Sequence, residues 1–334
     1  MKTLFPNRPS TLFRRAYFIA PLLAAAWLAL VPQTASGQAW PTKPIKIIVP
    51  FPPGGTSDPM ARIIGQKLGE ILGQSFVVEN KAGAGTTIGT AEVARAPADG
   101  YTLLLAPAPF VITQYVYPKL PYDGKKDFTP IGLIQTTPAV IVVNPKLGVR
   151  TPAELFQLVR SKPGRITFGT PGVGTLPHLI GELLNMQAGL NMAHVPYKGG
   201  APALNDLLAG VVDMAIMTPL IRDTVQSGKL VAIGTTSLRR TSSTPDWPTL
   251  AETVVPGFEA LAWFGLMARS NTPPDILKKL SAGMQEALQD PLVRQKIGTS
   301  GDVPLGTTQE FQDFLNREHD RWGHLVKQAA IKPE

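Results

Sequence analysis

Two glycine-rich segments stand where a strand pattern gives way to a helix pattern, and they are the clearest candidates for chemistry. They are FPPGGTSD at residues 51–58 and GTPGVGTLPH at residues 169–178. Glycine lets the backbone approach a ligand closely. A helix N-terminus offers unpaired N–H groups and a partial charge of about +0.5. Both segments therefore suit an anion held by backbone N–H groups.

The two segments are more informative together than singly. One helix dipole contributes about 0.3–2 kcal/mol, whereas micromolar affinity requires about 8 kcal/mol. Two loops that face each other across a closing cleft, with charge-assisted hydrogen bonds of about 1.5–3 kcal/mol each, reach that value. For the first segment alone, the alternative is a turn in which Ser57 or Asp58 only caps the helix.

Enzyme and cofactor chemistry is not supported by the other residues. The sequence has no cysteine, four histidines and no HExxH, GxSxG or GxxxxGK[ST] pattern, so we predict no catalytic residue, no metal site and no cofactor. His178 is predicted to be a hydrogen-bonding pocket or capping residue. The segment GAGTTIG at 83–89 has the wrong spacing for a dinucleotide fingerprint and favours a tight turn.

Short Val- and Ile-rich runs alternate with helical patterns from Pro44 onward, which is typical of parallel β-α-β units. Thr151 with Glu154, and Thr307 with Glu310, form capping boxes, and Thr272 is predicted to cap a further helix. The predicted strands are 45–49, 76–79, 101–105, 131–134, 139–143, 166–169, 194–197, 213–217, 230–235 and 261–268. The predicted helices are 58–72, 88–95, 152–161, 176–188, 201–209, 273–288, 291–299 and 309–328.

Residues 1–39 have the features of a cleaved export signal. A start with four basic residues and no acidic one precedes the apolar run 16–31, and small residues lead to Ala39. The run is short for a membrane span, although a retained anchor is the alternative, and Arg14-Arg15 also permits twin-arginine export. We therefore expect cleavage near Ala39 and a periplasmic protein.

The composition fits a folded binding protein. Apolar residues make up 44% and charged residues 17% of the 334-residue chain, enough apolar side chain for two cores. The net charge is +8, and +4 without residues 1–39, with the basic residues scattered. This pattern favours an anionic small molecule and argues against nucleic acid.

We expect an α/β fold of two doubly wound domains around a cleft. Residues 40–137 and 262–334 are predicted to form domain 1, and residues 138–261 domain 2. The chain would cross between them near residues 135–141 and 257–264, with Trp263 and Phe264 buried at the second crossing. The C-terminal helices have too few strands of their own and are expected to pack on domain 1.

Seven motifs in register resemble the Bug family, the extracytoplasmic receptors of tripartite tricarboxylate transporters. The likeness spans residues 40–333. It implies a type II periplasmic-binding-protein-like fold, a small organic carboxylate held by N–H groups of loops Pro53–Asp58 and Thr170–His178, and membrane permease subunits as partners. The motifs are VPFPPGGTSD, ENKAGAGTTIG, DGYTLLL, KLPYDGKKDFTPIGL, ITFGTPGVGTLPHL, VPYKGGAPALNDLLAGVVD and AWFGL.

One departure from the family concerns the ligand. After the third strand the family carries hydroxyl-rich residues, whereas this chain has Ala-Pro-Ala-Pro-Phe-Val at 106–111. We therefore expect the far end of the ligand to be apolar or aromatic, as in a monocarboxylate. The predicted ligand contacts are Pro53, Gly54, Gly55, Thr56, Ser57, Asp58, Pro107, Ala108, Pro109, Phe110, Thr170, Gly172, Val173, Gly174, Thr175, His178, Tyr197 and Asp213.

Some alternatives stay open at this point. Tyr197 is equally compatible with a surface turn, and Asp213 with a cap on the preceding turn. In function, a ligand-dependent sensor that acts on a membrane histidine kinase would use the same pocket. An exported hydrolase is the third hypothesis. We expect a monomer.

Overall fold

The computed structural model describes residues 40–117, 119–299, 301–304 and 306–329. The predicted export signal at 1–39 lies outside these residues. From Pro41 onward the chain belongs to one compact unit with two five-stranded sheets. Each sheet with its helices is called a lobe below. Within the described ranges, every helix is too short or too polar to cross a membrane.

The first sheet has the strand order β2-β1-β3-β10-β4. β1 pairs in parallel with β2 and β3, while β10 lies antiparallel between β3 and β4. Leu103, Leu104 and Leu105 of β3 are all buried, as expected for a strand covered on both faces. The strands are β1 (Ile45–Val49), β2 (Phe76–Asn80), β3 (Thr102–Pro107), β4 (Phe128–Pro138) and β10 (Leu261–Arg269).

The second sheet repeats this plan with the order β7-β6-β8-β5-β9. β6 is parallel to β7 and β8, and β5 lies antiparallel between β8 and β9. Each sheet is therefore a parallel core with one reversed strand. The strands are β5 (Val140–Val143), β6 (Thr167–Thr170), β7 (Ala193–Pro196), β8 (Met214–Met217) and β9 (Val231–Thr235).

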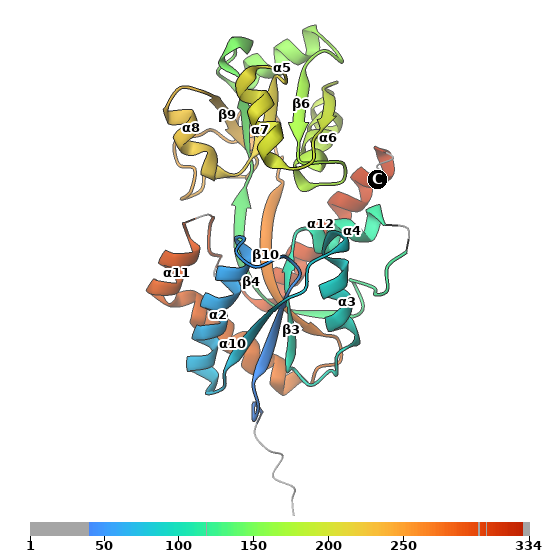
Figure 1. The fold of residues 1–334 in the computed structure, drawn as a ribbon, viewed down its shortest axis with the longest axis vertical. Helices are drawn as coiled ribbons and strands as arrows, with labels where there is room; N and C mark the ends of the chain where they lie inside the picture. The colour runs from blue at the N-terminus through green and yellow to red at the C-terminus, as the bar shows by residue number, and fades with distance from the viewer. Residues whose placement is uncertain (1–39, 118, 300, 305, 330–334) are drawn as a thin grey trace, which may run out of the picture. The chain divides into compact units, whose positions relative to one another are not determined.

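The C-terminal helices pack on the first lobe, as the sequence predicts. α10 (Pro274–Gln289) contacts α2 (Ser57–Leu72), and α12 (Thr308–Gln328) contacts α4 (Pro109–Val116); both also contact β4 (Figure 1). The amphipathic α12 buries Phe311, Leu315 and Trp322 along one side. The first lobe also contains α3 (Thr87–Arg95), α11 (Pro291–Ile297) and the single turn η1 (Ala84–Thr86).

Five α-helices accompany the second sheet. Both predicted capping boxes are present, Thr151 with Glu154 at α5 and Thr307 with Glu310 at α12. The helices are α5 (Pro152–Ser161), α6 (Leu176–Ala188), α7 (Gly200–Ala209), α8 (Arg222–Gln226) and α9 (Leu250–Thr253), with single turns η2 (Pro145–Leu147) and η3 (Pro219–Ile221).

Two local predictions are wrong. No helix is predicted between residues 95 and 152, but Pro109 is the first residue of α4, whose many β-branched and aromatic residues carry little helix signal. Thr272 does not cap α10, because the N-cap residue is Pro273 and the Thr272 hydroxyl donates to the Arg269 carbonyl.

The two connections between the lobes are tied together by Thr236. Its hydroxyl accepts from Ala139 N–H at 2.8 Å and donates to the Ala260 carbonyl. Trp263 is buried near the second connection, as predicted, and its indole N–H donates to Glu318 of α12 at 3.1 Å. Phe264, which was also predicted to be buried, is only half-buried. We propose the domain boundaries at 137/138 and 261/262, each within one residue of the end of β4 at Pro138 or the start of β10 at Leu261.

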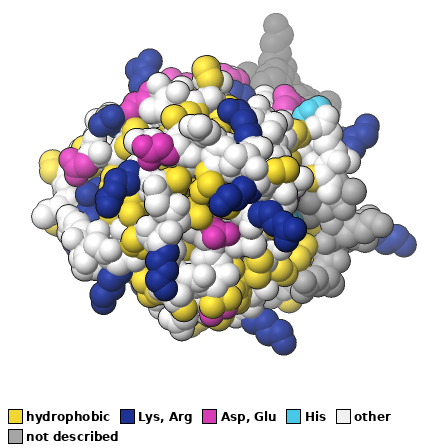
Figure 2. Space-filling view, turned by 90° about the horizontal axis from the view of Figure 1, so that it is seen from above, with side chains coloured by type: hydrophobic (Ala, Val, Ile, Leu, Met, Phe, Trp, Pro, Cys, Tyr) yellow, Lys and Arg dark blue, Asp and Glu magenta, His cyan; other side chains and the backbone are white. Residues whose placement is uncertain are grey.

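Lys and Arg side chains are dispersed over the face seen in Figure 2. They lie singly among uncharged and apolar side chains and do not form a continuous basic stripe on that face.

Candidate functional site

A cavity of about 670 Å³ lies between the two lobes. This volume is in the range of small-molecule sites. A hollow of similar volume lies over α11 and the 298–303 turn, away from the glycine-rich loops. The first lobe lines the cavity with Pro50, Phe51, Pro52, Ala82, Gly83, Gly85, Thr86, Pro109, Ile112, Thr113, Val116 and Tyr117, and the second lobe with Val173, Gly174, Thr175 and Leu176.

The wall of this cavity is uncharged and mostly apolar. Among the described residues no Asp, Glu, Lys, Arg or His lines it. Three helices begin at it: α3 follows Thr86, α4 follows Ala108 and α6 follows Thr175. A small anion in this cavity would be stabilised by helix N-termini and neutral hydrogen-bond donors.

The second glycine-rich loop forms the second-lobe wall. β6 ends at Thr170, and the chain reaches α6 through Gly172 (φ 144°) and Gly174 (φ 74°), both in the region that favours glycine. A Cβ on Gly174 would lie 3.7 Å from Val116 of the first lobe. The Thr175 hydroxyl donates to the Gly172 carbonyl at 2.7 Å and so does not cap α6.

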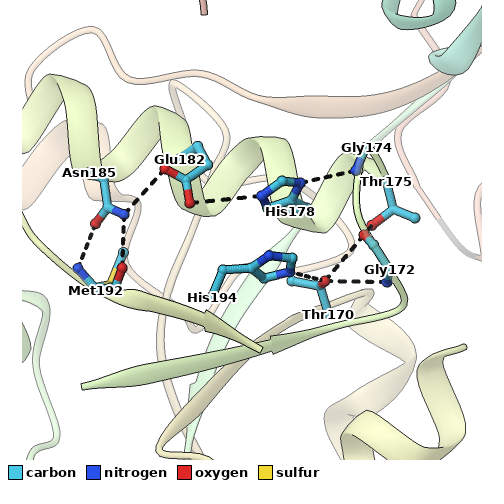
Figure 3. A network of polar contacts seen from close by, with 9 residues as sticks. All are labelled: Thr170, Gly172, Gly174, Thr175, His178, Glu182, Asn185, Met192 and His194. Carbon is cyan, nitrogen blue, oxygen red and sulfur yellow. Dashed lines mark hydrogen bonds and ion pairs between the residues drawn. The ribbon is translucent and has the colours of Figure 1, made fainter. Parts of the chain in front are cut away.

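Two stacked histidines hold this loop (Figure 3). His178 Nδ1 accepts the Gly174 N–H at 3.0 Å, and its ring stacks on His194 with centroids 3.9 Å apart. His194 Nε2 lies 2.6 Å from the hydroxyl of Thr170. Burial, with a smaller effect of His194, lowers the pKa of His178 to about 4. A neutral ring with a free Nδ1 lone pair can accept the Gly174 N–H, so His178 fixes the shape of the loop.

These contacts decide which N–H groups of the loop remain for a ligand. Gly174 N–H is bound to His178, Gly172 N–H to Thr170 Oγ1, and Thr175 N–H to the Gly172 carbonyl. Within the described part of the chain, the N–H groups of Val173 and Leu176 have no protein partner. These two are the donors that residues 172–176 can offer.

The first glycine-rich loop lies differently from the sequence expectation. Only Phe51 and Pro52 reach the cavity, while Pro53–Thr56 are exposed and a Cβ on Gly54 or Gly55 would meet open space. Ser57 and Asp58 are buried in the first turn of α2. Arg62 pairs with Asp58 at 3.1 Å and lowers the pKa of its carboxyl. Asp58 thus has a structural partner and does not cap α2.

The helix α4 presents one side to the cavity. Pro109, Ile112, Thr113 and Val116 follow helical spacing and line the wall. Phe110 points the other way: it is fully buried and packs edge-to-face on Phe128 at 5.2 Å. Pro107 and Ala108 end β3 and enter α4 without lining the cavity. The structure therefore places Pro109 at the cavity and Phe110 in the core.

Tyr197 and Asp213 also lie outside the cavity wall. The Tyr197 hydroxyl donates to Asp206 at 2.7 Å, and burial together with this carboxylate raises the pKa of Tyr197 to about 12. Asp213 accepts from the N–H and hydroxyl of Thr167, at 2.8 and 2.9 Å. Thr167 is the first residue of β6, whereas the second glycine-rich loop follows the last residue of β6. Asp213 therefore lies at the opposite end of this strand from the glycine-rich loop.

The turn at Gly83–Thr86, predicted from the sequence only as a tight turn, also forms part of the cavity wall. A Cβ on Gly85 (φ 61°) would lie 3.0 Å from the Tyr117 hydroxyl, so glycine is required by both conformation and space. Thr86 has φ 84°, and its buried hydroxyl has no hydrogen-bond partner among the residues that the structure describes. The sequence contained a signal for this wall, a glycine-rich turn between a strand and a helix, which is the same pattern that identified the first and second glycine-rich loops.

Comparison with solved structures gives the class of protein. An R. palustris protein solved with adipate is 33% identical and superposes with a TM-score of 0.72, covering 88% of this chain and 100% of that one. MatC from Rhodopseudomonas palustris, solved with bound malate, is 30% identical with a TM-score of 0.69, covering 86% and 100%. Two α/β lobes with a cavity between them thus define a periplasmic-binding-protein-like solute receptor.

Sequence comparison gives the family. The model of the tripartite tricarboxylate transporter family receptor matches residues 60–331. The protein BugT of Bordetella pertussis is 38% identical over 301 residues, which cover 89% of this chain and 92% of BugT. The chain belongs to this family of Bug-type receptors, which are binding proteins and not enzymes.

Proposed function

We propose that this receptor binds a small organic carboxylate in the cavity between the lobes and delivers it to the permease subunits of a tripartite tricarboxylate transporter. The observation that most supports this proposal is that α3, α4 and α6 begin at the wall of a cavity that is lined by no charged side chain of the described residues. The related proteins solved with adipate and malate support a carboxylate as the ligand.

The second lobe would hold the carboxylate with the N–H groups of Val173 and Leu176. Both are without a protein partner among the described residues and stand at the start of α6. Charge-assisted hydrogen bonds contribute about 1.5–3 kcal/mol each. The N–H groups of Gly55 and Thr56 on the first glycine-rich loop are likewise unbound, and we propose that they reach the ligand when the lobes close.

The remainder of the ligand would be apolar. Phe51, Ile112 and Val116 supply apolar wall, and the Thr113 hydroxyl is engaged by the Pro109 carbonyl at 2.9 Å. Few groups on this side can therefore hold a second carboxylate. A branched or aromatic monocarboxylate fits this wall better than citrate or aspartate.

The cellular setting follows from the family and the N-terminus. We propose that residues 1–39 are an export signal cleaved near Ala39 and that the mature receptor acts in the periplasm as a monomer. We expect bound ligand to be recovered unchanged, as for a binding protein of this family.

Mass spectrometry of small molecules that copurify with the mature protein tests the proposal first. Calorimetry follows with phenylacetate, isovalerate, adipate, malate, citrate and aspartate. We expect a copurified carboxylate, and tighter binding of phenylacetate or isovalerate than of citrate or aspartate. The opposite ranking refutes the apolar far end, and no binding of any carboxylate refutes the receptor proposal.

A further inference from the structure

Thr86 differs from the other threonines on the cavity wall because its hydroxyl has no hydrogen-bond partner among the described residues. The Thr113 hydroxyl donates to the Pro109 carbonyl at 2.9 Å and the Thr175 hydroxyl to the Gly172 carbonyl at 2.7 Å. The Thr86 side chain is on the same wall, the residue is only 4% exposed, and its hydroxyl has no partner within the described protein. A buried hydroxyl without a hydrogen bond destabilises the fold.

The backbone at Thr86 carries a second penalty. Its φ is 84°, in the left-handed region that a β-branched residue rarely adopts. Its carbonyl accepts the Thr90 hydroxyl at 2.9 Å, and its N–H donates to the Gly83 carbonyl at 3.1 Å. These backbone contacts therefore hold Thr86 in this conformation, although no described residue forms a hydrogen bond with its hydroxyl.

The position of Thr86 indicates the charge of its partner. It is the N-cap residue of α3, a nine-residue helix without a side-chain cap or an acidic residue in the first turn. The positive end of a helix favours an anion. Lys81 is the nearest cation in sequence, and it pairs with Glu79 and Glu92 at 3.9 and 3.6 Å. It does not line the cavity.

We propose that the Thr86 hydroxyl donates a hydrogen bond to a carboxylate oxygen of the ligand, which makes the Gly83–Thr86 turn a part of the first-lobe half of the headgroup site. The Val173 and Leu176 N–H groups form the second-lobe half. This inference rests on the proposed function and adds a third glycine-rich turn, at the N-terminus of α3, to the loops already considered.

The pair of variants Thr86→Val and Thr86→Ser tests the hydroxyl. Valine keeps the β-branch and the shape, and serine keeps the hydroxyl. The ligand is the carboxylate of the calorimetry panel that the wild-type mature protein binds most tightly. Loss of one charge-assisted hydrogen bond should weaken binding of Thr86→Val by about 10- to 150-fold. Thr86→Ser should remain within about 3-fold of wild type.

Stability separates a ligand contact from a structural role. The urea midpoint of Thr86→Val should equal or exceed that of wild type, because the variant removes an unpartnered polar group. Thr272→Val is the matched control: Thr272 is buried away from the cavity wall and donates its hydroxyl to the Arg269 carbonyl at 2.7 Å, so its midpoint should fall while its affinity stays within about 3-fold. Wild-type affinity in Thr86→Val overturns the Thr86 inference and leaves the receptor intact. If wild type binds no carboxylate in the panel, both proposals fall together.

Discussion

Acidification should destabilise this protein through His178. The imidazole is buried, stacks on His194 and accepts the Gly174 N–H. Its pKa falls from an ordinary value of 6.5 to about 4 in the folded protein. Between these two values the unfolded chain binds more protons than the folded one, so stability is lost as the pH falls below about 6.5 and the loss is complete below about 4.

The magnitude follows from the difference between the two pKa values. A fall from 6.5 to about 4 corresponds to about 3 kcal/mol. His194 and His319 also have pKa values lowered by burial, so wild type alone cannot isolate His178. The variant His178→Asn does so, because an asparagine amide oxygen can take the place of Nδ1 and does not titrate.

Urea unfolding of both proteins at pH 7, 6, 5 and 4 measures the effect. The wild-type free energy of unfolding should fall by up to about 3 kcal/mol more than that of His178→Asn over this range. His324→Asn, at an exposed position on α12, controls for the loss of one histidine and should follow wild type. Parallel curves for wild type and His178→Asn would show that His178 is not held neutral by burial.

Three further predictions concern the loop, the strand edge and the buried acid. Gly174→Ala should weaken carboxylate binding in calorimetry, whereas the control Gly148→Ala should not. The two glycines have nearly equal φ, 74° and 76°, so each variant should lose about 1–2 kcal/mol of stability in urea unfolding. Asp213→Ala should lower stability by about 1–3 kcal/mol, because its hydrogen bonds to Thr167 are lost, and should leave ligand affinity unchanged. A clear loss of affinity would show that Asp213 contributes to ligand binding. Glu318→Leu should cost about 2–6 kcal/mol in urea unfolding, because it leaves two buried indole N–H groups unpaired and removes one of the two carboxylate partners of Arg321. A cost below about 1 kcal/mol contradicts this account.

Local sequence signals predicted most elements correctly. Ile45–Val49 and Leu176–Ala188 have the predicted bounds, and the capping boxes at α5 and α12 are formed. These signals depend on residues only a few positions apart, so they can be recognised without knowing the fold. α4 lacks such a signal, since its β-branched and aromatic residues fit a strand or a helix equally.

The candidate site depended on contacts that no local pattern encodes. Sequence identified the second glycine-rich loop and a hydrogen-bonding or capping role for His178, but the stacking of His178 on His194 of β7, which holds its ring, is a tertiary contact. The first loop has the same strand-to-helix pattern, yet its glycines face open space while Gly85 lies on the cavity wall. Which helix N-terminus reaches a ligand is set by how the lobes pack.

By itself, the sequence determined the alternation of strands and helices, the glycine-rich turns and the family, because spacing, capping and turn chemistry are local properties of the chain. The tertiary structure decided which of these turns enclose the cavity, which N–H groups remain unbound there, and which residues, such as Phe110 and Asp213, serve the fold instead. The physical reason is that burial and hydrogen-bond partnership depend on residues distant in sequence.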